Sequence, residues 1–191
     1  MTMVVADMSM SVDGFVAGPN TDAEHPLGHG GELLHRWLFA DPRDPQDSEV
    51  AAELTASVGA VVLGRRTFDV GVNIWGDVPF PAPCFVLTHR PHDERVMARG
   101  SFTFVTGGVP QAISRARAAA GDRNVQLMGA ETVQQVMAAG LVDEIGINLV
   151  PVLLGRGVRM FAALPADHVD LTRTRVIASD SATHLRFRVA G

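Results

Sequence analysis

Short apolar runs alternate with amphipathic stretches along most of the chain. The runs that predict buried strands are Met3–Met10, Val61–Leu63, Cys84–Leu87, Phe102–Val105 and Asn124–Met128. Between them, helical spacing predicts helices at 31–39, from 47 or 48 to about 58, directly after the Val61 run, at 110–120 and at 130–139. Such alternation is typical of a largely parallel sheet covered by helices on both faces.

Two local details of these elements are expected from side-chain chemistry. Asp47 or Ser48 is placed to cap the second helix, whose buried stripe would be Val50, Leu54 and Val58. Residues 72–83, with Trp75 and three prolines, are predicted to form a loop.

The last third of the chain follows a different pattern. Glu144–Val150, Leu171–Ile177 and Thr183–Val189 alternate apolar with polar or small residues, which predicts antiparallel strands at one end of the sheet. The predicted fold is therefore α/β and three-layered, with a mixed, mostly parallel sheet of about eight strands and an antiparallel C-terminal hairpin. Because no linker is visible, residues 1–191 are expected to form one domain.

Composition narrows the class of protein. The net charge of −5 argues against a nucleic-acid-binding protein, whose footprint is a basic face. No apolar run approaches about 18 residues, so no membrane span is expected. The N-terminal residues lack a signal-peptide pattern, and the single cysteine, Cys84, excludes an internal disulfide. These features predict a cytoplasmic protein.

Three strand ends carry residues that could meet around one anionic ligand: Gly64-Arg65-Arg66-Thr67, Thr88-His89-Arg90 and Gly129-Ala130-Glu131-Thr132. In open α/β sheets, ligands bind beyond the carboxyl ends of the strands. Two of the three segments open helices, whose free N–H groups favour anions, and arginine suits phosphate. The alternative at each position is an ordinary turn with solvated side chains.

The order of several motifs along the chain resembles the dihydrofolate reductase-like family that includes the reductase of riboflavin biosynthesis, the RibD C-terminal domain family. The resemblance rests on five segments, which follow one another in the expected order: 10–18, 63–68, 87–90, 140–145 and 151–157. It implies NADPH binding, hydride transfer to a C=N or C=O carbon of a small pterin-, pyrimidine- or ribosyl-type substrate, and a homodimer. No lysine is present, so arginines would carry the phosphate contacts.

The resemblance also suggests a role for particular residues. Arg65 and the Thr88–Arg90 turn would surround the 2′-phosphate, Arg66 and Thr67 would lie near the pyrophosphate, and residues 129–132 would cover it from the other side. Asp13, in the loop after the first strand, would orient substrate or relay a proton, or else simply form a turn before Gly14. Glu32 and Trp75 are candidates for substrate binding.

Some features leave alternatives open. The family usually has two glycines where this chain has Met128-Gly129, often with a cis peptide bond, and a Met128 side chain directed at the ligand would lower affinity. A non-catalytic nucleotide-, flavin- or folate-binding homodimer of the same fold is the second hypothesis. His25, His29 and His35 match no tight ligand motif, so no metal is expected.

Overall fold

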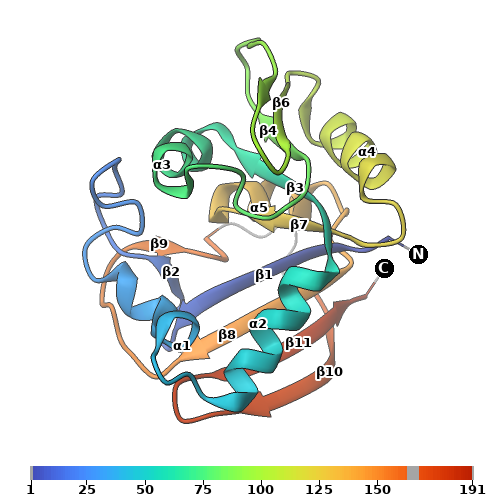
Figure 1. The fold of residues 1–191 in the computed structure, drawn as a ribbon. Coiled ribbons are helices and arrows are strands. Elements are labelled where there is room, and N and C mark those ends of the chain that lie inside the picture. Colours follow the sequence, from blue (N-terminus) through green and yellow to red (C-terminus); the bar gives the residue numbers. More distant parts are fainter. Residues whose placement is uncertain (1, 163–167, 191) are drawn as a thin grey trace.

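The computed structural model describes residues 2–162 and 168–190, and its centre is a nine-stranded mixed sheet (Figure 1). The strand order is β10-β11-β8-β1-β7-β3-β4-β6-β5. The six neighbours from β8 to β6 are parallel, whereas β10, β11 and β5 are antiparallel to the strands beside them. This confirms the predicted mixed, mostly parallel sheet. The bounds are β1 Val4–Ser11, β3 Val58–Gly64, β4 Cys84–Leu87, β5 Arg95–Val96, β6 Ser101–Val105, β7 Asn124–Met128, β8 Glu144–Val150, β10 Leu171–Ala178 and β11 Thr183–Val189.

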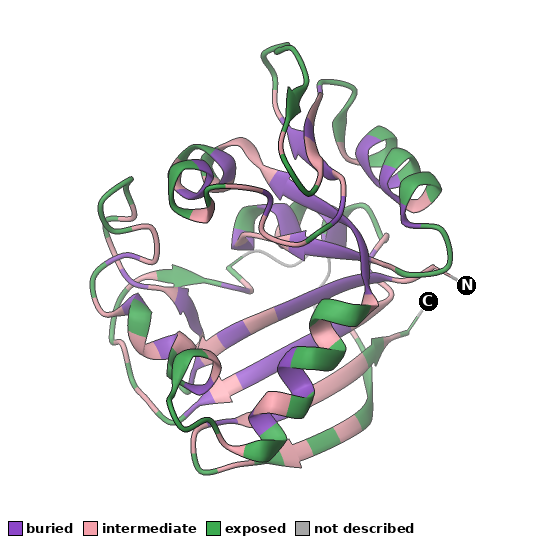
Figure 2. Cartoon of the chain, viewed as in Figure 1, coloured by how far each residue is buried: buried purple, intermediate pink, exposed green. Residues whose placement is uncertain are grey.

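Helices cover both faces of the sheet and give three layers. The helical elements are a 3₁₀ turn at Gly31–His35, α1 Arg36–Phe39, α2 Pro45–Ser57, α3 Arg65–Trp75, α4 Gly108–Ala120 and α5 Ala130–Ala138. Side chains alternate across β3: Ala60 and Val62 share a core with α4 and α5, whereas Val61 and Leu63 share one with α3. Figure 2 shows the buried sides of α4 and α5 turned toward the sheet and the exposed sides turned away.

The start and end of α2 differ from the sequence prediction. The helix begins at Pro45, and the carboxylate of Asp44 caps it by accepting a hydrogen bond from the N–H of Gln46 at 2.8 Å. The predicted caps, Asp47 and Ser48, are wrong, because Asp47 lies inside the first turn and is fully buried. Val58 was expected on the helix stripe. It instead opens β3 and pairs with Asn124, since a β-branched residue at a helix end readily continues into an extended ladder.

Helix α3 is longer than expected and takes in part of the predicted loop at 72–83. It continues to Trp75 and ends at Gly76, whose φ of 63° terminates a helix without side-chain strain. Gly71 sits in mid-helix because the indole of Trp75 folds back over it: a Cβ on Gly71 would lie 2.2 Å from an indole carbon. The turn-rich composition obscured this packing.

A second, two-stranded sheet joins segments far apart in the sequence. Its strands, β2 (Phe15–Ala17) and β9 (Val158–Arg159), pair antiparallel, and neither was predicted. Backbone crosses backbone closely beside it, because a Cβ on Gly157 would lie 2.1 Å from the carbonyl oxygen of Ala17. The loop after β1 is therefore fixed against the connection that follows β8.

Within the described residues, every helix is too short or too polar to cross a bilayer.

Candidate functional site

The three predicted strand-end segments lie at one edge of the sheet. They follow β3, β4 and β7, which are adjacent and parallel in the order β7-β3-β4. Carboxyl ends of parallel strands point the same way, so residues 64–67, 88–90 and 129–132 are brought together as one surface. This strand order could not be predicted from the sequence.

Two helices begin side by side on this surface and touch through small residues. A Cβ on Gly64 would lie 3.1 Å from the hydroxyl of Thr132, and a Cβ on Gly129 would lie 2.4 Å from the hydroxyl of Thr67. Neither α3 nor α5 has a side-chain cap, which leaves first-turn N–H groups available to a ligand. Gly129 has a φ of 90°, a conformation that favours glycine.

The side chain of Arg65 extends from α3 toward the loop after β4. Its Nε donates to Asp69 at 2.8 Å, and its Nη1 lies 2.5 Å from Nε2 of His92. The guanidinium carbon is 5.9 Å from the ring centre of Phe104, within cation–π range. Nearby, the hydroxyl of Thr88 accepts a hydrogen bond from the N–H of Arg90 at 3.1 Å. His89 and Arg90 themselves are exposed.

Arg66 points away from Arg65 and contacts the loop that follows β2. Its Nη2 donates to the hydroxyl of Thr21 at 2.8 Å and to the Thr21 carbonyl at 3.2 Å. Of the α5 residues, Ala130 and Thr132 are buried and Glu131 is exposed. The two arginines thus border opposite sides of the surface formed by the two helix starts.

The carboxylate of Asp13 holds the chain after β8. Its oxygens accept hydrogen bonds from the N–H groups of Leu154, at 3.1 Å, and Gly155, at 2.7 Å. A hydrogen bond with the Ser11 hydroxyl, together with these two N–H groups, lowers the pKa of Asp13 to about 2. Asp13 is therefore ionised at neutral pH and engaged in a turn contact.

The two substrate-binding candidates lie on different elements. Glu32 is exposed in the 3₁₀ turn at Gly31–His35. Trp75 stacks on Phe102 with ring centres 6.4 Å apart, and it packs against the core beneath α3. Trp37, by contrast, is only 2 % exposed and lies in the core.

The side chain of Met128 packs against the core between α3 and the sheet. It is therefore directed away from the surface where the helices begin. A methionine in place of the family's first glycine does not put its side chain on that surface. Among the described peptide bonds, the cis one is Asp41–Pro42, and Met128–Gly129 is trans.

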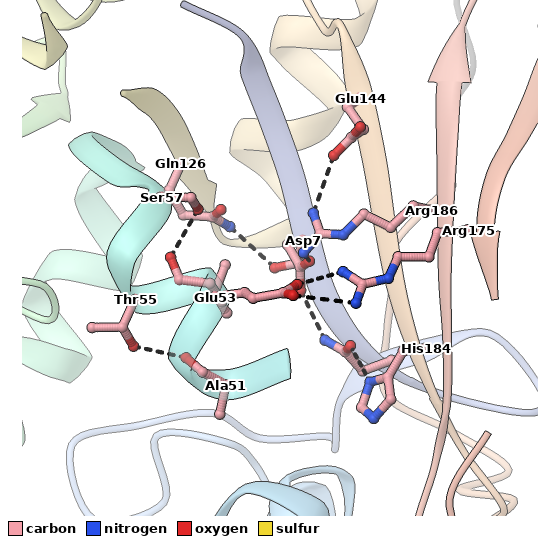
Figure 3. A network of polar contacts seen from close by, with 12 residues as sticks. Asp7, Ala51, Glu53, Thr55, Ser57, Gln126, Glu144, Arg175, His184 and Arg186 are labelled. Atoms are coloured by element: carbon pink, nitrogen blue, oxygen red, sulfur yellow. Dashed lines mark hydrogen bonds and ion pairs between the residues drawn. The ribbon is translucent and has the colours of Figure 1, made fainter. Parts of the chain in front are cut away.

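A buried polar network, missed at the sequence level, lies between α2 and the strands β1, β8 and β11. Asp7 accepts one hydrogen bond from Asn148, at 2.8 Å, and pairs with Arg186 at 3.0 Å. Figure 3 shows Asp7 between Gln126 and Arg186. His184 lies 2.7 Å from Asn148 Oδ1 and 2.9 Å from Asp47 Oδ1. The remaining oxygen of Asp47 has no partner in the described part of the chain. The sequence feature that could have revealed this network is the presence of polar residues within otherwise apolar strands.

A family model settles which family these elements come from. The model of the RibD C-terminal domain matches residues 2–185. The chain belongs to the RibD C-terminal domain family. A curated relative, the uncharacterized protein YwjB of Bacillus subtilis (strain 168), is 28 % identical over 132 residues, which are 67 % of this chain and 71 % of YwjB.

Solved structures show that this family member has the dihydrofolate reductase-like fold. A putative riboflavin biosynthesis protein from Shewanella sp. PV-4 is 24 % identical, with a TM-score of 0.75 and full coverage of both chains. Dihydrofolate reductase from Enterococcus faecalis, solved with NADP(H), is 15 % identical, with a TM-score of 0.62 over 99 % of this chain and 97 % of its own. A deaminase/reductase from Thermotoga maritima is 13 % identical, with a TM-score of 0.66; the match covers 99 % of this chain and 57 % of that protein's chain.

Proposed function

We propose that the protein is an NADPH-dependent reductase that transfers hydride to a C=N or C=O carbon of a small pterin-, pyrimidine- or ribosyl-type substrate. Membership of a reductase family supports this activity. The observation that carries it is the meeting of two uncapped helix starts, at Gly64 and Gly129, beside Arg65. Backbone N–H groups at two helix starts and an adjacent arginine are the chemistry that a phosphorylated dinucleotide requires.

In this proposal the chain's own residues bind and orient. Arg65, Thr88, His89 and Arg90 would hold the 2′-phosphate, while residues 66–67 and 129–132 would border the pyrophosphate. The bound dinucleotide supplies the hydride, as redox cofactors do. Asp13 acts by holding the segment at Leu154 and Gly155 in place, since an ionised carboxylate with two N–H partners is a poor proton donor.

Cofactor discrimination tests the proposal. In Arg65→Ala, we expect NADPH affinity to fall by roughly tenfold to a hundredfold, because a charge-assisted contact with a dianion is lost. NADH affinity should change little, since its ribose carries no 2′-phosphate. Calorimetric titration of both cofactors measures this difference, and equal losses would remove Arg65 from the 2′-phosphate site.

A non-catalytic binding protein is the second candidate, and the engagement of Asp13 in a turn favours it. A thermal-shift panel of NADPH, NADH, FMN and folates separates the ligands, because a ligand that binds the native state raises the melting temperature. NADPH oxidation with a pterin or pyrimidine substrate then decides for the reductase. Under either hypothesis we propose a homodimer.

A further inference from the structure

His92 shares one aromatic platform with Arg65, although it lies 27 residues away in the sequence. The imidazole packs against Phe104 at a tilt of 42°, with ring centres 5.0 Å apart, and the guanidinium of Arg65 lies 5.9 Å from the centre of the same ring. Phe104 therefore fixes the positions of both nitrogen-bearing groups. The two groups also contact one another directly, with Arg65 Nη1 2.5 Å from His92 Nε2.

Within the described residues, the hydrogen-bonding groups at this contact are not all paired. A guanidinium has only donors, so Nε2 of His92 is the acceptor in its contact with Arg65. Asp69, on α3, receives the Nε–H of Arg65. The Nη2 group has no partner within the described residues, and it lies beside an exposed imidazole. A compact dianion placed here would find the guanidinium fork and a ring that can become a second donor.

We propose that His92 is a specificity-determining residue, which forms with Arg65 the receptor for the phosphate monoester that distinguishes NADPH from NADH. This inference rests on the proposed function. A neutral 2′-hydroxyl cannot compensate the guanidinium charge and accept hydrogen bonds from both groups, whereas a doubly charged phosphate can, so the pair favours the phosphorylated cofactor. His92 lies outside the turn Thr88–Arg90 that the sequence assigned to this role.

Two substitutions separate the contribution of the His92 ring nitrogens from the packing of its ring on Phe104. His92→Phe keeps an aromatic ring on Phe104 and removes the ring nitrogens, and His92→Gln keeps a polar group that cannot take up a proton. His168→Gln, at an exposed histidine elsewhere in the chain, is the control. The dissociation constants of NADPH and NADH, and competition by 2′,5′-ADP against 5′-AMP, are measured for each full-length variant, with circular dichroism as the check of folding.

We expect His92→Phe to weaken NADPH and 2′,5′-ADP about tenfold, a change of one charge-assisted hydrogen bond, while NADH and 5′-AMP stay within about twofold. His92→Gln should show the same loss, so that unfolding of one variant leaves the other to decide. Equal weakening of both cofactors, or unchanged discrimination, would overturn the role of His92. If the wild type itself does not prefer NADPH, the proposed function fails first and this inference with it.

Discussion

At the residue scale, the site depends on two glycines that each face a threonine of the other helix. Gly64 lies against Thr132 and Gly129 against Thr67, so the starts of α3 and α5 are as close as backbone and a short side chain allow. A methyl group at Gly129 would meet the hydroxyl of Thr67 at 2.4 Å and would also force φ = 90° on an L-residue. The spacing of the two helix starts therefore leaves little room for any side chain at Gly129.

Gly129→Ala should reduce stability and NADPH affinity together. A comparison is available in Gly140→Ala, because Gly140 also has positive φ (66°) but an added Cβ would meet nothing within 4 Å. We expect this control to lose roughly 1–2 kcal/mol of unfolding free energy from backbone strain alone, and Gly129→Ala to lose more. Adding Thr67→Ala to the Gly129 variant should recover the part of the loss that comes from the contact with the Thr67 hydroxyl. Urea unfolding measures all three, and a Gly129 variant no weaker than the control would refute the contact argument.

At the scale of elements, α2 is attached to the sheet by a buried contact between an imidazole and a carboxyl group. His184 and Asp47 are 5 % and 0 % exposed, and their atoms lie 2.9 Å apart. Asn148 donates its N–H to Asp7, so its oxygen faces His184 and requires a proton on Nδ1. The contact between Nε2 and Asp47, on the other side of the ring, is likewise withdrawn from water.

Removing one member of this pair should be costly. His184→Leu leaves a buried carboxylate without its partner, and we expect a loss of about 3–5 kcal/mol in urea unfolding. The matched control is Arg175→Gln, which breaks the half-exposed pair between Arg175 and Glu53 and should cost about 0–1 kcal/mol. Losses of similar size in the two variants would show that the buried pair contributes no more than a surface one.

The segment after β8 is attached through Asp13, and this contact predicts a dependence on acid. The folded-state pKa of about 2 lies below the ordinary 3.8, so the stabilisation is complete above about pH 4 and disappears as the pH falls toward 2. Asp13→Asn lacks this titration. Its melting temperature should therefore lie below that of the wild type at pH 5 to 7 and approach it near pH 2. A constant gap across this range would mean that the carboxylate charge does not matter.

At the scale of the whole molecule, the outer end of the sheet presents apolar side chains to solvent. Leu171 and Val176 of the edge strand β10 are 42 % and 48 % exposed, and they pair with Val189 and Leu185 of β11. Exposed apolar surface on an edge strand is a typical site of association. The alternation that predicted these strands also led to the homodimer prediction.

Native mass spectrometry tests that prediction. The wild type is expected at twice the 20.3 kDa of one chain. Val176→Glu, which places a charge on the apolar side of β10, should shift the population toward the single chain. Thr172→Glu is the control, because Thr172 is exposed and pairs with Arg188 on the other side of the strand. A wild type that is a monomer at micromolar concentration would contradict the prediction.

Most of the sheet could be predicted from the sequence, because apolar runs such as Val61–Leu63 and alternation such as Glu144–Val150 reflect burial on two faces or one. The strands that were not predicted are β2, β5 and β9. They have two or three residues each, too few to show a hydrophobic period. The strand-end segments were found for a similar reason: glycine, arginine and threonine at a strand-to-helix junction are a local signal. His92 was missed because its significance comes from Arg65 and Phe104, which are remote in the sequence.

The sequence by itself determined the family, the alternation of strand and helix, and the residue types at the ends of β3, β4 and β7, because these are properties of neighbours along the chain. Only the tertiary structure decided that β7, β3 and β4 stand side by side, that Arg65 and Arg66 turn in opposite directions, and that Asp47 meets His184. These are contacts between distant segments. They follow from strand order and from the packing of helices on the sheet, which local periodicity does not encode.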